Sequence, residues 1–132
     1  MEKEIRNDVK GIGRFIFETG ADREQLHLHI SEVGPGKRAH PPHTHDGQEI
    51  FYVFSGEGEV LFGEETHQVT DNEAVHVDCQ VLHGIRNVGK TPLRYAVIIA
   101  KWQMLQNTTF QYALQVSSYS EVSSVNGAEY RW

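Results

Sequence analysis

The chain has 132 residues, of which 39% are hydrophobic and 23% charged, and its formal net charge is -6. This length predicts one domain with one hydrophobic core. The acidic balance argues against nucleic acid as a partner, because such binding needs clustered cations, and no apolar run is long enough to cross a bilayer.

The first residues and the cysteine content indicate a compartment. Met1-Glu2-Lys3-Glu4 lacks the apolar stretch of a secretory signal, and the single Cys79 cannot form an internal disulfide. We therefore expect a cytoplasmic protein with no membrane partner. Cys79 itself fits a small buried residue best, with a soft metal ligand or a redox-sensitive thiol as the alternatives.

Two short strands are predicted before residue 32, at the end of 11–18 and over 25–31. In the second, Leu26, Leu28 and Ile30 alternate with His27 and His29, so the two sets lie on opposite faces. The two histidines have the spacing of a metal-binding pair, but no carboxylate follows them on a returning strand. The preferred interpretation of this pair is therefore an ordinary polar face.

The stretch from His43 to Glu49 brings together three residues that bind metals. His43 and His45 are two positions apart and share one face of an extended strand. Asp46-Gly47 predicts a turn, and a strand over 49–54 is expected to return antiparallel, placing Glu49 beside His45. Divalent transition ions accept imidazole nitrogen and carboxylate oxygen at about 2.0 to 2.2 Å. The spacing thus predicts a metal site, which the nearby His40 could support.

The rest of the chain continues the pattern of short strands. They are predicted at 59–63, 64–70, 74–77, 83–88 and 93–100, with turn residues between them. Such spacing favours an all-β sandwich or barrel. A fourth metal ligand has to come from elsewhere in the chain, and spacing alone leaves His67, His76 and His83 open.

These residues resemble the cupin family. His43, His45, Glu49 and Gly56 fit its first motif, in which a His-x-His pair is followed by a glutamate and then a glycine. The second motif keeps its histidine and asparagine as His83 and Asn87, while Asp78 and Gln80 stand where the family has proline and glycine. The resemblance covers about residues 26–100. It implies one cupin domain over 1–132, with residues 107–132 as a C-terminal extension.

The resemblance implies a double-stranded β-helix, or jelly-roll, barrel that holds a metal through His43, His45, Glu49 and His83. Three imidazoles and a carboxylate suit Fe, Mn, Ni, Co, Cu or Zn. Four protein ligands leave two positions open on an ion that prefers six, whereas they close zinc, so we favour iron, manganese, nickel or cobalt.

Two classes of function follow from such a site. One is an enzyme of dioxygenase, decarboxylase or isomerase type that acts on a small oxygen-rich substrate, with Arg86 or Tyr95 orienting a carboxylate or donating a proton. The other is a non-catalytic module that binds a metal or a small molecule such as a sugar, and the fold alone does not choose between them.

One further expectation concerns assembly. The segment 110–116 alternates like a strand, and a jelly roll has sheet edges that invite pairing with its own chain or with another. We expect a homodimer.

Overall fold

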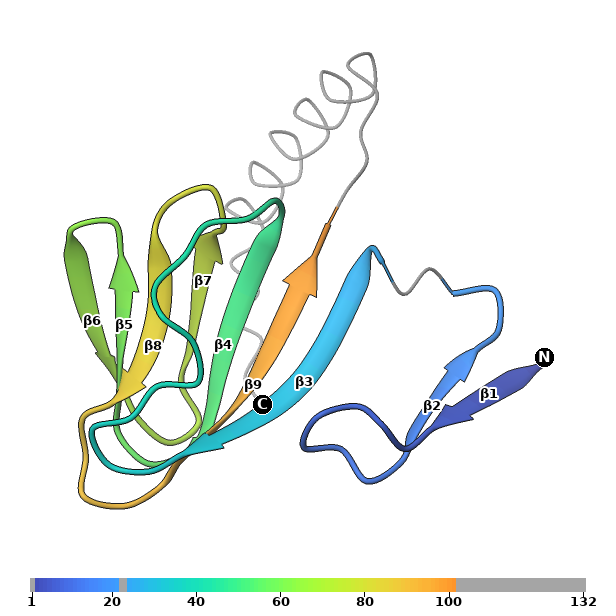
Figure 1. Cartoon of the computed structure of the whole chain (residues 1–132), viewed down its shortest axis with the longest axis horizontal. Coiled ribbons are helices and arrows are strands. Elements are labelled where there is room, and N and C mark those ends of the chain that lie inside the picture. The colour runs from blue at the N-terminus through green and yellow to red at the C-terminus, as the bar shows by residue number, and fades with distance from the viewer. Residues whose placement is uncertain (1, 22–23, 102–132) are drawn as a thin grey trace, which may run out of the picture. The chain divides into compact units, whose positions relative to one another are not determined.

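The computed structural model describes residues 2–21 and 24–101, and these form strands without any helix (Figure 1). No described segment therefore forms a helix that could span a membrane. The strands are β1 (Lys3–Arg6), β2 (Phe15–Glu18), β3 (Leu26–Val33), β4 (Gln48–Ser55), β5 (Gly58–Phe62), β6 (Glu65–Val69), β7 (Ala74–Asp78), β8 (His83–Asn87) and β9 (Leu93–Ala100). The strands predicted between residues 15 and 100 are confirmed. The strand predicted over 110–116 lies outside the described residues, and β1, in the charged N-terminal stretch, was not predicted.

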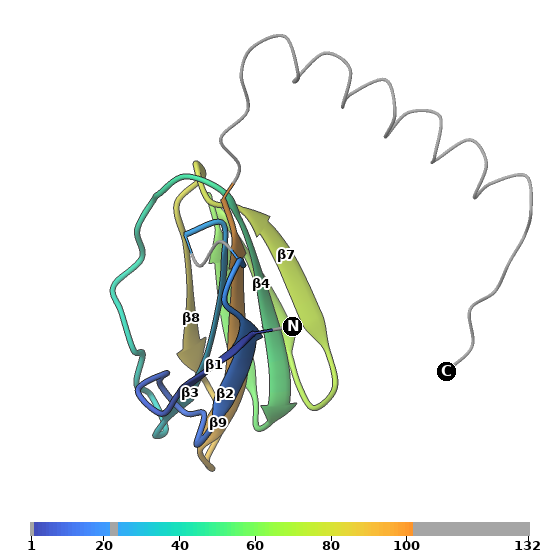
Figure 2. The ribbon, with the colours of Figure 1, turned by 90° about the vertical axis from the view of Figure 1, so that its right-hand side faces the viewer.

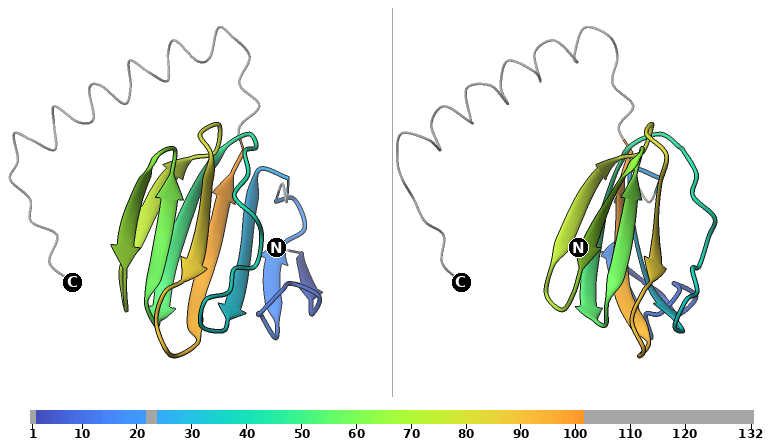
Figure 3. Two further views of the ribbon diagram at one scale, coloured as in Figure 1. Left: turned by 60° about the vertical axis from the view of Figure 1, so that its left-hand side comes forward. Right: turned by 90° about the vertical axis from the view of Figure 1, so that its left-hand side faces the viewer.

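Two sheets stand face to face, as Figure 2 and Figure 3 show from different sides. One has the strand order β3-β9-β4-β7 and the other the order β6-β5-β8, while β1 and β2 form a small sheet of their own. The chain crosses between the two larger sheets after β4, β6, β7 and β8, which is the winding of a jelly roll. The predicted fold class is confirmed, although in the described residues strand pairing does not close the two sheets into a full barrel.

Alternation along the strands places the core between these sheets. On β4, Glu49, Phe51 and Val53 point inward and are at most 4% exposed, whereas Phe54 is 40% exposed. The apolar members of the core are Phe51, Val53, Val60, Val69, Val77, Ile85, Leu93, Tyr95 and Val97. Residues that point inward from both sheets therefore share one buried layer.

The hairpin predicted between residues 43–45 and 49–54 is wrong. β4 pairs with β7 and β9, while His43 forms a β-bridge with His83 of β8 through backbone hydrogen bonds of 3.0 and 3.1 Å. The turn at Gly47 instead carries the chain from one sheet to the other. Gly47 has a φ of 101°, and a Cβ there would lie 2.4 Å from the carbonyl oxygen of Ala100, so glycine is needed.

The two faces of β3 also differ from expectation. His29 pairs with Val97 of β9, and Val97 pairs with the inward-facing Phe51 of β4, so the histidine face of β3 points into the protein. The apolar face is the outer one, and Leu26 on it is 64% exposed. The interpretation of the histidine pair as an ordinary polar face is therefore wrong for His29, which is half-buried.

Candidate metal site

Four side chains from two short stretches of the chain, 45–49 and 79–83, converge at one end of the core. His45 precedes β4, Glu49 lies at its start, Cys79 follows β7, and His83 begins β8. Their ligand atoms all lie within 4.8 Å of one another. Glu49 Oε2 is 2.8 Å from His83 Nε2 and 3.7 Å from His45 Nε2, and the two Nε2 atoms are 3.2 Å apart. The cluster joins residues of both large sheets.

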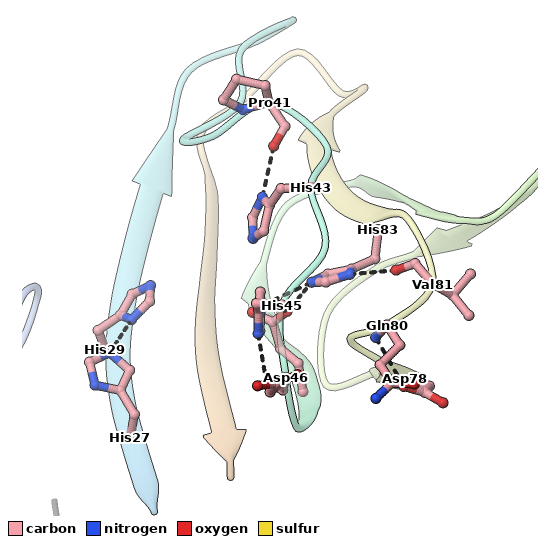
Figure 4. A network of polar contacts seen from close by, with 11 residues as sticks. His27, His29, Pro41, His43, His45, Asp46, Asp78, Gln80, Val81 and His83 are labelled. Carbon is pink, nitrogen blue, oxygen red and sulfur yellow. Dashed lines mark hydrogen bonds and ion pairs between the residues drawn. The ribbon is translucent and has the colours of Figure 1, made fainter. Parts of the chain in front are cut away.

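Backbone carbonyls fix which nitrogen each imidazole turns toward the cluster. His45 Nδ1 is 2.9 Å from the Asp46 carbonyl oxygen, and His83 Nδ1 is 2.8 Å from that of Val81 (Figure 4). A carbonyl oxygen only accepts hydrogen bonds, so each Nδ1 carries the hydrogen and donates it. In the neutral rings, the Nε2 atoms then hold lone pairs that face the cluster, as in imidazoles that bind metals.

Without a cation, this arrangement leaves a buried carboxylate oxygen of the cluster, Glu49 Oε2, without a hydrogen-bond partner. Glu49 is 4% exposed, and its Oε2 accepts no hydrogen bond of good geometry even though His83 Nε2 is 2.8 Å away. Two ligands about 2.1 Å from a common ion lie about 3.0 to 3.4 Å apart for octahedral to tetrahedral angles. The observed separations of 2.8, 3.2 and 3.7 Å bracket that range. The residues present therefore fit a metal ion.

His43 and Cys79 flank this group on different sides. The His43 ring centroid is 5.2 Å from that of His45 and 4.9 Å from that of His83, and its Nδ1 is 2.8 Å from the Pro41 carbonyl oxygen. His43 is exposed, and it is not a member of the 4.8 Å group. Cys79 is fully buried, and burial, with Glu49 and Asp78 nearby, raises the pKa of its thiol to about 11.

A cavity of about 240 Å³ opens beside the cluster. Its apolar wall includes Phe51, Ile85, Val97 and Ile99. Its polar lining consists of His45 and Glu49 of the cluster together with His29, His40, His43, Tyr95 and Lys101. His40 also contacts His43 edge to face, with ring centroids 6.2 Å apart. The cavity can thus hold a small molecule next to a bound ion.

The two residues predicted to assist chemistry lie in different environments. Tyr95 is 2% exposed and lines the cavity, and burial raises the pKa of its phenol, partly offset by the hydroxyl of Ser31 beside it. Arg86 lies on the outer face of β8, where its guanidinium contacts Glu59 Oε1 at 2.8 and 2.9 Å. The structure therefore brings Tyr95 to the cavity and leaves Arg86 outside it.

Other motif residues support the backbone. Asn87 is 1% exposed, donates to the carbonyl oxygens of Val33 and Thr91 at 3.0 and 2.7 Å, and accepts a hydrogen bond from the Gly89 amide at 2.9 Å. Where the family has proline and glycine, Asp78 Oδ1 accepts a hydrogen bond from the Gln80 amide at 3.0 Å and shapes the turn that leads to His83.

The remaining candidates lie away from the cluster. His67 and His76 are both exposed and line a hollow at the edges of β6 and β7. Neither belongs to the group of ligand atoms.

Comparison with known proteins shows which family the chain resembles. Residues 29–99, more than half of the chain, match the family model "Cupin domain". Mannose-1-phosphate guanylyltransferase RfbM of Salmonella typhimurium is 34% identical over 62 residues, which are 47% of this chain and only 13% of RfbM.

Solved structures agree on the fold. A predicted oxalate decarboxylase from Thermotoga maritima is 21% identical with a TM-score of 0.58, over 76% of this chain and 92% of that one. The Cnp3 cupin domain of Schizosaccharomyces pombe is 18% identical with a TM-score of 0.56, over 62% and 70%. The family match and the jelly-roll topology together establish that the chain belongs to the cupin family.

Proposed function

We propose that the protein is a metal-dependent enzyme that acts on a small oxygen-rich molecule, with the metal held by His43, His45, Glu49 and His83. The observation that carries this proposal is the buried Glu49 carboxylate without a hydrogen-bond donor, facing two imidazoles whose Nδ1 atoms are already engaged. His43 has the same link from Nδ1 to a backbone carbonyl, which leaves its Nε2 free to bind the ion.

The cavity supports an activity on a small molecule. A bound ion would supply Lewis-acid polarisation of an oxygen-bearing group and, if it is iron or manganese, access to dioxygen chemistry. The chain supplies the rest: Phe51, Ile85 and Val97 exclude water from one wall. Because burial raises the pKa of Tyr95, its phenol keeps its proton at neutral pH and can donate a hydrogen bond to a ligand oxygen.

Metal analysis of the purified protein tests the site. His45→Ala and Glu49→Ala should lower the metal content to near zero, while His67→Ala, a matched change of an exposed histidine, should leave it unchanged. Equal metal loss in His67→Ala and His45→Ala, with both variants folded by circular dichroism, would show that the assignment is wrong.

Cobalt distinguishes His43 from Cys79 as the fourth ligand. A thiolate on cobalt(II) gives a strong near-ultraviolet charge-transfer band, whereas nitrogen and oxygen ligands do not. We expect no such band in the cobalt-loaded protein and a spectrum unchanged in Cys79→Ser. A band that disappears in Cys79→Ser would instead assign the fourth position to sulfur.

Reconstitution with single metals separates an enzyme from a binding module. The apoprotein is loaded with iron, manganese, nickel, cobalt or zinc in turn, and substrate loss and oxygen uptake are followed with small hydroxy acids, keto acids, diketones and sugars. We expect turnover with one of the first four ions and its loss on chelation. Tight binding of a ligand without turnover under any ion would favour the non-catalytic module.

We also propose that the protein is a cytoplasmic homodimer. The exposed apolar side chains Leu26, Ile16 and Ile5, each at least 50% exposed, support burial against a second copy. The free, fully buried Cys79 agrees with a reducing compartment. Sedimentation at tens of micromolar should give twice the monomer mass of 15.0 kDa, and a species at the monomer mass would contradict the dimer.

A further inference from the structure

His27 and His29 place two imidazole nitrogens side by side on β3. Both side chains leave the same face of the strand, and His27 Nε2 lies 2.9 Å from His29 Nδ1 (Figure 4). The two rings meet edge to face, with centroids 5.1 Å apart. The metal cluster contains neither histidine, and β9 lies between β3 and β4 in the sheet. The pair is therefore separate from the cluster.

The separation of the two nitrogens matches one particular coordination angle. With each nitrogen about 2.0 to 2.1 Å from a shared ion, a separation of 2.9 Å corresponds to an angle of about 90° at the ion. Neighbouring ligands of octahedral and tetragonal ions subtend this angle, whereas a tetrahedral ion such as zinc needs about 109° and a separation of about 3.4 Å. The pair thus fits copper(II) or nickel(II), whose tetragonal sites use nitrogen ligands.

Both rings can offer a lone pair at neutral pH. Burial, followed by the charges of His27 and Lys10, lowers the pKa of His29 to about 4, so this ring is neutral. His27 is exposed, and its ring can rotate about the side-chain bonds until its Nε2 lone pair points to the same ion as His29 Nδ1. The other nitrogen of each ring then carries the hydrogen. Without an ion, the same contact is one hydrogen bond between the two rings.

A cavity of about 340 Å³ borders the pair. Its lining includes residues of the N-terminal segment, among them Arg6 and Asp8, together with His40. A water molecule takes about 30 Å³ in the liquid, so the cavity has room for an ion and the waters that complete its coordination. The carboxylate of Asp8 and the imidazole of His40 line the same space and can accept hydrogen bonds from those waters.

The charges around the pair limit how tightly it holds an ion. Arg6 contacts Asp8 at 2.7 and 2.8 Å, so these two charges largely offset each other. Lys10 also lines the cavity, and its backbone carbonyl accepts a hydrogen bond of 2.8 Å from the amide of Ile30, which holds it beside β3. A cation that disfavours a protonated His29 also disfavours a metal ion there. The pair should therefore fill when copper is added and lose the ion on purification.

We infer that His27 Nε2 and His29 Nδ1 form a second metal site, which takes copper(II) or nickel(II). The two nitrogens occupy neighbouring positions on the ion, and water fills the others. His29 and His40 also line the cavity beside the cluster, so the second ion lies at a wall that the two cavities share. The site requires no ion in the cluster and no enzymatic activity, so it goes beyond the proposed function.

Titration of the untagged protein with copper(II), followed by electron paramagnetic resonance, tests this inference. The wild type should bind one equivalent more than His27→Ala or His29→Phe, and the difference spectrum should show an axial signal split by two nitrogens. His67→Ala, which removes an exposed histidine elsewhere, should bind as many equivalents as the wild type. Circular dichroism checks the fold of each variant. Because His27 is exposed, His27→Ala keeps the test decisive even if His29→Phe does not fold.

Two further variants separate this site from the cluster. Lys10→Met should bind the His27-dependent equivalent roughly threefold or more tightly, because a positive charge next to the ion is removed. His45→Ala should lose the ion of the cluster and keep the His27-dependent equivalent. If the cluster of the wild type held no metal, the proposed function would fail while this equivalent remained. Equal copper stoichiometry in the wild type and His27→Ala, or a difference signal with fewer than two nitrogens, would overturn the inference.

Discussion

Replacing Glu49 by glutamine should stabilise the metal-free protein and abolish metal binding at the same time. A buried carboxylate oxygen without a donor costs about 1 to 3 kcal/mol of stability, and Glu49 Oε2 is such an atom. His83 Nδ1 donates to the Val81 carbonyl, so the Nε2 atom of the neutral ring, 2.8 Å from Glu49 Oε2, is an acceptor. A glutamine amide at this position would donate to it. Replacing the unpaired carboxylate oxygen by a donating amide should therefore raise the free energy of unfolding by about 2 kcal/mol, or Tm by roughly 10 °C.

Denaturant unfolding with a chelator present measures this gain, and elemental analysis of the same preparations measures the metal. Glu64→Gln is the matched control because Glu64 is exposed, and it should change neither quantity. A metal-free Glu49→Gln protein that is less stable than the wild type would refute the reasoning, since the carboxylate would then have a partner in the empty site. Retention of metal by this variant would refute the role of Glu49 as a ligand.

Three further predictions follow from buried groups. Asn87→Ala should cost about 2 to 4 kcal/mol in denaturant unfolding, because it removes three buried hydrogen bonds to backbone groups; a loss below 1 kcal/mol would contradict this. In the metal-free protein, Cys79 should react slowly with iodoacetamide at neutral pH and faster as the pH rises toward about 11. In the unfolded protein the rate should instead rise around the ordinary thiol pKa of 9.0. The folded pKa of His29, about 4, is below its ordinary 6.5, so its contribution to stability is full above pH 6.5 and falls between 6.5 and 4. His29→Phe should lessen the loss of stability in that window, and an unchanged pH profile would contradict the assignment.

Sequence patterns predicted most of the strands and much of the cluster, because both depend on the spacing of residues that are near one another in the chain. Alternation located the segments that became β2 to β9, and the spacing of His45 and Glu49 brought two members of the cluster together. Spacing alone did not choose His83 from the later histidines; the family motif did. β1 was missed because its four residues include three charged ones, which resemble a solvated terminus.

The errors concern pairing between distant segments. The hairpin expected at Gly47 required adjacent segments to pair, but the segment at His43 bonds to β8 of the other sheet instead. Alternation also separated the two faces of β3 without showing which one turns inward. That depends on β9, some seventy residues later in the chain, and it explains why His29 was not recognised as a cavity residue.

The division of the cluster between the two sheets has a mechanical consequence. Glu49 belongs to the sheet of β4, and His83 belongs to the sheet of β8, with the chain crossing between them. An ion bound by both would act as a removable cross-link, restraining the separation of two layers that are otherwise held together mainly by side-chain packing. Amide hydrogen exchange should then slow on metal loading in β4 and β8 together, while the distant β1 and β2 keep their exchange rates.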